Sequence, residues 1–410
     1  MQSDKKSRRE FLLSAAAGAI ALGTSCSTQQ TGALEERADT AEKRSQAGGL
    51  QKRVLGRSKL SVSLLGFGVL HVTDPVLYQR AVDRGVTYFH FVEDQNTRNR
   101  LSPDVHNLGA CAALRPFRRH LVASYMTVQR SSKAVMLQDL DGFLHDSGFG
   151  HLDIWYVCCP SPGQWDDFCE AFAEARQAGK VQCAAISTHR LANDGDRLTA
   201  ADSPIDVVML TYNYTSSADD QVRLAKLNAA GLGLVPMKPL AGRFDEATTG
   251  RPDACLRWLA ADPRVHSIPV AMQSTEQLDQ NIAALQQPLS EEDRRRLTAS
   301  LLHVSPRFCR MCGACDGTCP NGLAVSDLVR VAMYLEGYRD PGLARFHLES
   351  IPAPRQRLSC DGCARCSVAC PNGVAVRDRI LKAQELVLFR NIWRFSCHLI
   401  LIPFNKAIAP

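Results

Sequence analysis

The chain has 410 residues, of which 45% are hydrophobic and 22% are charged, enough to build two hydrophobic cores. Its formal net charge is only +6, and it has no basic stripe with interleaved aromatic residues, which argues against nucleic acid as a partner. Sixteen cysteines are typical of a reducing compartment, whereas the N-terminal residues indicate export.

Residues 1–30 predict a signal peptide. Arg8 and Arg9, followed by Phe11 and Leu12, precede a mild apolar run rich in Ala and Gly, and this pattern resembles a twin-arginine signal. The run is too short and too weakly apolar to be a stable transmembrane helix. We expect the twin-arginine translocase to carry the folded chain into the periplasm or another extracytoplasmic compartment, and a chance pair of arginines is the alternative.

A lipid anchor is a second open reading of this region. Cys26 follows "LGTS" and weakly resembles a lipoprotein cleavage site, although Gly23 stands where a larger aliphatic residue is expected. Residues 31–51 are rich in Gln, Glu, Ala and Gly and have little to bury, so they are predicted to be a flexible linker.

Residues 52–306 alternate short apolar runs with amphipathic helical segments. Eight runs can be counted: "VSLLGFGV", "VTYFHFV", "HLVASYMTV", "LDIWYVCCP", "VQCAAIST", "DVVMLTYN", "GLVPMKPL" and "VHSIPVAM". Eight β-α units over roughly 250 residues fit one closed barrel. The predicted fold class is therefore α/β, with a (β/α)8 TIM barrel whose chemistry lies at the carboxyl ends of the strands.

Several stretches of this region are similar to successive signatures of the aldo/keto reductases. They are "RVLGRSKLSVSLLGFGV", "AVDRGVTYF", "HLDIWYVCCP", "GKVQCAAISTH", "VVMLTYNY", "MKPLAGR" and "STEQLDQNIAAL". More narrowly, the chain resembles the subgroup with a C-terminal ferredoxin-like extension. The resemblance implies a nicotinamide-dependent carbonyl reductase with an Asp-Tyr-Lys-His tetrad, in which the Tyr donates a proton while the cofactor delivers hydride.

Every tetrad position holds a different residue in this chain. His90 stands for the Asp, Gln95 or its neighbour Asn96 for the Tyr, Tyr125 for the Lys and Cys158 for the His. Proton donation by a phenol needs a nearby cation to lower its pKa, and neither Gln95 nor Asn96 supplies the phenol. The sequence therefore predicts that ordinary carbonyl reduction is lost, with proton donation by Tyr125 from a new direction as the alternative.

The resemblance also implies a nucleotide site. The family pattern places cofactor-contacting or supporting residues at Ser187, Asn213, Leu240, Gly242, Gln277 and Asn281. The start of the last helix near Ser274 is a further candidate, because free backbone amides there suit a phosphate. Against NAD(P) stand the missing glycine in "IPVAMQS" and the lack of an arginine for a 2'-phosphate. These residues otherwise serve as loop scaffolding in a barrel that binds no nucleotide.

Side chains of unusual chemistry follow the first five predicted strands. They are His71, His90, Tyr125, Cys158, Cys159 and His189. Thiolate and imidazole ligands at a common mouth would suit a transition metal or a haem edge. Cys158 and Cys159 point in opposite directions along a strand, so at most one faces the barrel axis. The alternative is that each is an ordinary packed residue.

Two cysteine motifs follow the barrel. "CRMCGACDGTCP" at 309–320 and "CDGCARCSVACP" at 360–371 share the spacing C-x2-C-x2-C-x3-C-P. This spacing is typical of ligands to a 4Fe-4S cluster, whereas a zinc ribbon normally uses paired C-x2-C knuckles without the third cysteine. A disulfide framework is not expected to repeat one spacing with the same trailing proline.

The pair of motifs resembles the double 4Fe-4S ferredoxin type, in its α-helical variety, over residues 307–385. The intervening "SDLVRVAMYLEGY" and "PGLARFHLESIPAP" are predicted to form helix, break and helix. In that family the fourth cysteine of each motif ligates the other cluster. The resemblance therefore implies one ligand set of Cys309, Cys312, Cys315 and Cys370, and a second of Cys360, Cys363, Cys366 and Cys319.

Residues 386–410 form an apolar and aromatic tail with interspersed Arg390, Arg394 and Lys406. It suits either a peripheral position at a membrane interface or packing against the rest of the protein. The whole pattern predicts an exported iron-sulfur oxidoreductase or electron-transfer protein, with a redox protein or a membrane electron carrier as partner. The alternative is a non-catalytic barrel that acts as a scaffold, with clusters that serve a partner enzyme.

Overall fold

The computed structural model describes residues 50–69, 74–93, 105–128, 131–158, 160–242, 252–356, 360, 363 and 366–385, without the side chains of 105 and 106. The predicted signal peptide with Cys26, nearly all of the linker and the C-terminal tail lie outside the described residues. So do His71, Gln95, Asn96 and Cys159.

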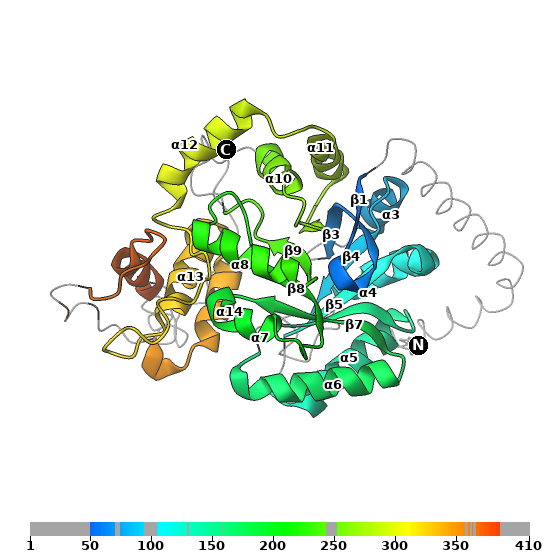
Figure 1. The fold of residues 1–410 in the computed structure, drawn as a ribbon, viewed down its shortest axis with the longest axis horizontal. Coiled ribbons are helices and arrows are strands. Elements are labelled where there is room, and N and C mark those ends of the chain that lie inside the picture. Colours follow the sequence, from blue (N-terminus) through cyan, green and yellow to red (C-terminus); the bar gives the residue numbers. More distant parts are fainter. Residues whose placement is uncertain are drawn as a thin grey trace, which may run out of the picture.

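The centre of the molecule is a sheet of eight parallel strands surrounded by helices (Figure 1). The strand order is β10-β3-β4-β5-β6-β7-β8-β9, and β9 and β10 at its two ends contact each other. The strands are β3 (Leu65–Val69), β4 (Tyr88–Val92), β5 (Val122–Thr127), β6 (Leu152–Cys158), β7 (Val181–Thr188), β8 (Ile205–Thr211), β9 (Gly233–Met237) and β10 (Ile268–Val270). Each of the eight predicted apolar runs coincides with one barrel strand to within a residue or is longer than it, so the predicted (β/α)8 barrel is confirmed.

Helices lie on the outside of the barrel, and all but the last two stand between successive strands. They are α3 (Pro75–Asp83), α4 (Val105–Leu114), α5 (Lys133–Ser147), α6 (Trp165–Gln177), α7 (Leu191–Leu198), α8 (Ala218–Ala229), α10 (Pro252–Ala260), α11 (Thr275–Leu285) and α12 (Glu291–Val304). Many begin at a capping side chain: the hydroxyls of Ser132, Ser217, Ser274 and Ser290 each accept a backbone N–H of the first turn. Such caps satisfy amides that have no partner inside the helix.

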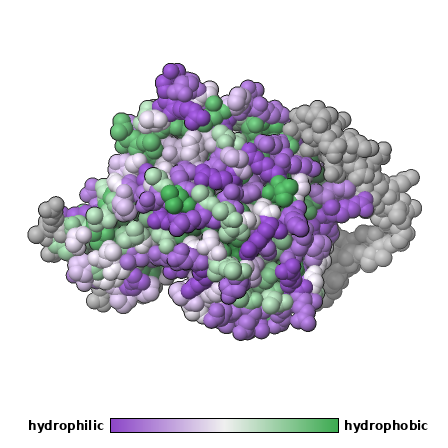
Figure 2. Space-filling view, viewed as in Figure 1, coloured by the Kyte–Doolittle hydropathy of each residue, from purple (hydrophilic) through white to green (hydrophobic). Residues whose placement is uncertain are grey.

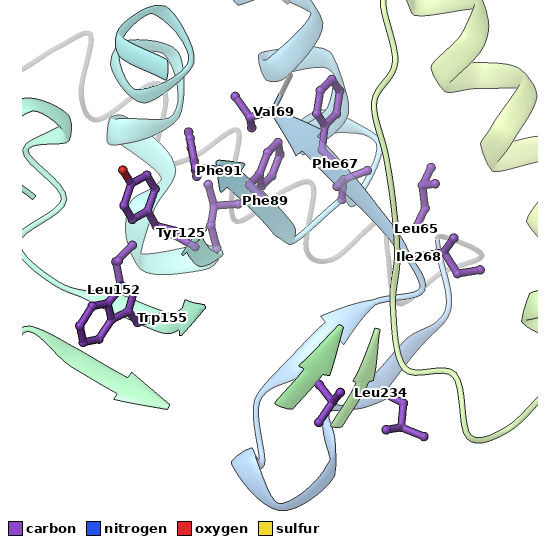
Figure 3. Packing of buried hydrophobic residues seen from close by; sticks show 14 of the residues in the cluster. Leu65, Phe67, Val69, Phe89, Phe91, Tyr125, Leu152, Trp155, Leu234 and Ile268 are labelled. Carbon is purple, nitrogen blue, oxygen red and sulfur yellow. The ribbon is translucent and has the colours of Figure 1, made fainter. Parts of the chain in front are cut away.

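Side chains alternate between the barrel interior and the outer layer, as the period of two in a strand requires. On β4, Tyr88 belongs to the interior cluster, whereas Phe89 and Phe91 pack in the layer between strands and helices. Figure 3 shows part of this outer layer, with Phe89 and Phe91 beside Phe67 from β3. The Phe67 and Phe89 rings stack at 5.8 Å between centroids.

A short antiparallel hairpin closes the amino-terminal end of the barrel. It pairs β1 (Lys52–Val54) with β2 (Ser61–Ser63), and Leu55 between them is fully buried in the interior cluster. Gly56 has φ +52°, and a Cβ there would collide with the backbone of Gly233, so only glycine fits. The hairpin was not predicted, and the expected flexible linker ends earlier than residue 51, because Leu50 is buried in the barrel core.

The residues after the barrel build a second, helical core. It contains α13 (Val325–Glu336), α14 (Pro341–Ser350) and a helix over 376–385, which lie to one side of the barrel (Figure 1). The predicted helix, break and helix are therefore present. The core also includes Tyr214, Ala241 and Ala254 of the barrel, so the two parts share one apolar interface. Arg257 of α10 donates to both carboxylate oxygens of Asp293, at 2.8 and 2.9 Å, and fixes α12 beside this interface.

The face drawn in Figure 2 is mainly hydrophilic, with small scattered apolar patches. Within the part of the chain that the structure describes, none of the helices has the length and apolar character needed to cross a membrane.

Leu55, which plugs the amino-terminal end of the barrel interior, gives a test of the fold. Leu55→Ala should lower the free energy of unfolding by about 2–5 kcal/mol, because it leaves a cavity that rigid strands cannot fill. The matched control is Leu302→Ala, since Leu302 is 80% exposed and its loss should cost less than about 0.5 kcal/mol. Urea unfolding measures both values, and equal stability of the two variants would contradict the plug.

Candidate functional site

The barrel interior contains a hydrogen-bonded group of side chains around His90. The Nδ1 atom of His90 lies 2.8 Å from Ser124 Oγ, and Ser124 Oγ donates to the Tyr88 hydroxyl at 3.0 Å. The Tyr88 and Tyr156 hydroxyls are 3.1 Å apart. Ser124 Oγ also lies 3.4 Å from Phe89 O, and the imidazole tautomer sets the direction of its bond with His90 Nδ1.

Burial decides the charge of this group. It lowers the pKa of His90 to about 3, so the imidazole is neutral near pH 7. Burial likewise raises the pKa of Tyr88 to about 12. His90 Nε2 is buried and has no hydrogen-bond partner among the described residues. A neutral imidazole in this setting cannot replace the carboxylate that the family pattern places there.

Tyr125 lies on the outer face of its strand, so the expectation that it faces the barrel mouth is wrong. Its ring stacks on Phe143 of α5 at 4.0 Å between centroids, and its hydroxyl donates to Asp139 at 2.9 Å. Figure 3 shows Tyr125 in the outer layer with Trp155. The strand alternation that makes Ser124 an interior residue turns Tyr125 outward, and it removes Tyr125 as a proton donor in the barrel.

Two of the remaining mouth candidates, Cys158 and His189, belong to the described residues. Cys158 ends β6 on the same face as Tyr156, half-buried, and His189 follows β7, also half-buried. Among the described residues, no group of three or more His, Cys, Asp or Glu side chains is arranged to hold a metal ion. This finding includes Cys158, His189 and the eight motif cysteines, whereas His71 and Cys159 lie outside the described residues.

The predicted nucleotide residues have structural contacts of their own. Asn213 is fully buried; its amide nitrogen donates to Lys238 O at 2.9 Å, and its oxygen accepts from the Thr215 hydroxyl at 2.7 Å. Leu240 packs against the second core, and Gly242 has φ +81°. These contacts match the scaffolding alternative for Asn213 and Leu240.

The beginning of α11 is already capped by its own residues. Ser274 Oγ accepts the Gln277 N–H at 3.3 Å, and Gln277 Oε1 accepts the Gln273 N–H at 2.8 Å. Glu276 adds a carboxylate to the first turn. The expectation of free amides for a phosphate at this helix start is therefore wrong for these two groups. Ser187 is buried on β7, and Asn281 lies half-buried on α11.

The helical part covers the carboxyl ends of β8 and β9. Thr211, the last residue of β8, donates to the Met311 sulfur at 3.3 Å. Just after β9, the Lys238 ammonium lies 5.3 Å from the Tyr334 ring centroid and 5.9 Å from that of Tyr338. Lys238 and Met311 both have positive φ, at 57° and 55°, a strained conformation for residues with a side chain. Such strain at an interface persists only where surrounding contacts hold it.

The first cysteine set draws on both motifs. Burial raises the pKa of Cys309 to about 11, and the neighbouring Cys312 and Cys370 thiols add to the increase. Burial also raises the pKa of Cys315 to about 12, and Cys309 and Cys370 are again among the neighbours that add to it. Cys370 of the second motif therefore lies with Cys309, Cys312 and Cys315 of the first.

The second set mirrors the first. Its members are Cys319 of the first motif and Cys360, Cys363 and Cys366 of the second, which together line one small cavity. Burial raises the pKa of Cys360, and the other three thiols add to the increase. No disulfide joins any of these eight cysteines. The four thiols of each implied set are therefore neighbours, although among the described residues neither set is arranged to hold a metal ion.

Comparison with known proteins agrees with the barrel. Residues 119–254 match the model of the Aldo/keto reductase family. The fold is similar to aldo-keto reductase AKR11C1 from Bacillus halodurans in its holo form, with a TM-score of 0.53 and 19% identity, covering 61% of this chain and 96% of that one. The apo form of the same enzyme gives a TM-score of 0.49 and 20% identity, over 61% and 95% of the two chains. No curated protein matches the chain.

At this identity the likeness to the reductase establishes the fold alone. Sequence reasoning missed the Tyr88, Ser124 and Tyr156 group inside the barrel. The alternation of strand residues was the available signal, because it places Tyr88 and Ser124 on the same side as His90. Sequence reasoning also missed Met311, whose contact with Thr211 depends on how the helical part is placed.

The hydrogen bond between Tyr125 and Asp139 on the outer face of the barrel predicts how stability depends on pH. Burial raises the pKa of Asp139 from 3.8 to about 7, and Glu93 adds to the shift. The folded state therefore holds this proton more tightly than the unfolded state, so the stability that Asp139 contributes is full below about pH 4 and is lost as the pH rises through about 7. Asp139→Asn should gain stability relative to the native chain as the pH rises across this window.

Urea unfolding at about pH 4.5, 6 and 8 measures this difference. Tyr125→Phe removes a donor to the Asp139 carboxylate, so it should move the window to higher pH. A stability difference between Asp139→Asn and the native chain that stays constant across the range would contradict the assignment.

Proposed function

We propose that this chain is an iron-sulfur oxidoreductase or electron-transfer protein that holds two 4Fe-4S clusters beside an aldo/keto reductase barrel. The observation that carries the proposal is the repeated cysteine spacing of the two motifs, and the proximity of Cys370 to the first motif and of Cys319 to the second supports it. Cys309, Cys312, Cys315 and Cys370 would hold one cluster, and Cys319, Cys360, Cys363 and Cys366 the other. The clusters would supply one-electron transfer when bound.

The donor chemistry fits this group. Thiolates are the usual ligands of iron-sulfur clusters, and the two sets offer four each. Their surroundings are apolar, because Cys309 and Cys360 are buried in the second core with Phe308 and Ile380. Such a core shields these two cysteines from water, while the other six are half-buried, and solvent access is one of the factors that set a cluster's potential.

Buried cationic side chains would offset the charge of the thiolates. Arg330 on α13 is 8% exposed and interacts favourably with the ionised form of Cys309. Arg310, next to Cys309 in the chain, interacts in the same way with Cys312 and Cys370. An anionic group buried without such partners is strongly disfavoured.

The position of the helical part supports a shared role with the barrel. It covers the ends of β8 and β9 through Met311 and Lys238, so the first cysteine set lies next to the barrel mouth in the chain and in space. We infer that a molecule bound in the barrel mouth would face the first cysteine set. A redox protein or a membrane electron carrier would exchange electrons with the second cysteine set. Nicotinamide is not part of the proposal, because two of the residues expected to contact it have scaffolding contacts.

Export is proposed on the sequence alone. The pair Arg8 and Arg9 would direct the folded, cluster-loaded chain to the twin-arginine translocase, and Cys26 or the tail would hold it at a membrane. Replacing both arginines with lysine should abolish accumulation outside the cytoplasm, and unchanged accumulation would refute this route.

The second candidate is a non-catalytic scaffold whose clusters serve a partner enzyme. The neutral, buried His90 and the outward-facing Tyr125 favour it, because neither can act as the family's acid machinery does. The two candidates differ in whether a small molecule bound in the barrel is chemically changed. Co-purifying small molecules, compared before and after chemical reduction of the protein, would distinguish them.

Iron analysis tests the proposal directly. Anaerobically purified protein should contain about eight irons and about eight sulfides per chain, and Cys312→Ser should lose about half of each. Cys183→Ala is the control, because Cys183 is a buried barrel cysteine outside both sets, and it should keep full iron. Iron near zero, or zinc in its place, would contradict the proposal.

A second prediction concerns the barrel. The chain should not reduce generic aldehydes with NADPH or NADH, because residues of a catalytic group act as a unit and all four tetrad positions differ. Nicotinamide oxidation followed at 340 nm, beside a reductase with an intact tetrad, measures this. Robust turnover that survives Tyr125→Phe would show that the alignment of these strand ends is wrong.

A further inference from the structure

The two cysteine motifs continue into the same short turn. Each fourth cysteine is followed by Pro-Asn-Gly, at 320–322 and again at 371–373. Gly322 N–H donates to Cys319 O at 3.0 Å, and Gly373 N–H donates to Cys370 O at 3.1 Å. The two glycines have φ +69° and +76°, which suits glycine at the end of such a turn.

The turn directs each asparagine across to the other motif. Asn372 Nδ2 lies 3.4 Å from Cys312 Sγ, and Asn321 Nδ2 lies 3.3 Å from Cys363 Sγ. In each case the amide reaches the second cysteine of the motif to which it does not belong. Each asparagine therefore reaches the opposite motif, just as Cys370 lies with the first motif and Cys319 with the second.

Arg310 fixes which end of the Asn372 amide faces the sulfur. Arg310 Nη1 donates to Asn372 Oδ1 at 2.8 Å. A guanidinium has only donors, so the atom beside it must be the amide oxygen, and the amide NH2 must point to Cys312. Arg310 and Asn372 are half-buried, whereas Asn321 is exposed.

We propose that Asn372 and Asn321 are positioning residues that each donate a hydrogen bond to a cluster-ligating thiolate, Cys312 and Cys363, and so raise the reduction potential of that site. The inference rests on the proposed function, since it requires clusters on these cysteines. A donor to a ligand sulfur stabilises the added negative charge of the reduced state. Water can replace an exposed donor more readily than a half-buried one, so Asn372 contributes more than Asn321.

The experiment uses the anaerobically purified full chain and a redox titration followed by electron paramagnetic resonance. Asn372→Leu should move one of the two midpoint potentials to a more negative value and leave the other in place, with iron content unchanged. Asn321→Leu should move the other potential, by a smaller amount. Arg310→Lys keeps the positive charge beside the thiols but loses the planar guanidinium that orients the asparagine, so it should shift the same potential as Asn372→Leu, in the same direction and by less.

The outcomes separate this inference from the proposed function. A native chain without iron refutes the proposed function itself. Full iron in the native chain and in the variants, with both potentials unchanged in Asn372→Leu and in Arg310→Lys, overturns the positioning role alone. If Asn372→Leu loses its cluster, the Arg310→Lys titration decides, and an unchanged potential there overturns the role.

Discussion

The exchange of one cysteine between the two motifs is the constraint on which the C-terminal part depends. Cys370 lies with the three closely spaced thiols of the first motif, and Cys319 with those of the second. The segment between the two motifs must connect the first cysteine set to the second, and α13 and α14 form this connection. Because both sets depend on the same two segments, their geometry is coupled, and the apolar core between them is the framework.

This apolar core contacts the barrel at the carboxyl ends of β8 and β9. The loops after β8 and β9 supply Tyr214 and Ala241 to the second core, and Met311 reaches Thr211. In a (β/α)8 barrel the carboxyl ends of the strands carry the chemistry. Here part of that end is taken by protein contacts, and Asn213 and Lys238 hold the loops in place. The same packing accounts for strained backbone at Lys238 and Met311, since a large interface can hold conformations that an exposed loop would release.

Much of the fold could be predicted from the sequence. All eight strands and the pair α13 and α14 follow from apolar periodicity, which depends on local alternation. The hairpin under the barrel could not be read in this way, because its strands have three residues each and Leu55 is defined by distant contacts. The direction of Tyr125 was predicted wrongly because matching a strand end by sequence leaves a one-residue uncertainty, and one residue reverses the side-chain direction.

The candidate site likewise has features that local sequence predicts and features that depend on the fold. The cysteine spacing strongly predicts two ligand groups, because most ligands of such a cluster are only a few residues apart in the sequence. The Asn372 amide and its Arg310 partner could not be found without the fold, because Asn372 lies 60 residues from Cys312 and 62 residues from Arg310 in the sequence. Buried partners of His90 likewise come from three different strands.

Cysteine protection in a Cys370→Ser chain tests the central claim most directly. The variant would be purified anaerobically, treated with an alkylating reagent and mapped by mass spectrometry. If each set draws on both motifs, Cys309, Cys312 and Cys315 should become reactive while Cys319, Cys360, Cys363 and Cys366 stay protected. Protection of Cys309, Cys312 and Cys315 together with exposure of Cys360, Cys363 and Cys366 would show that each motif forms its own site, which would contradict the account.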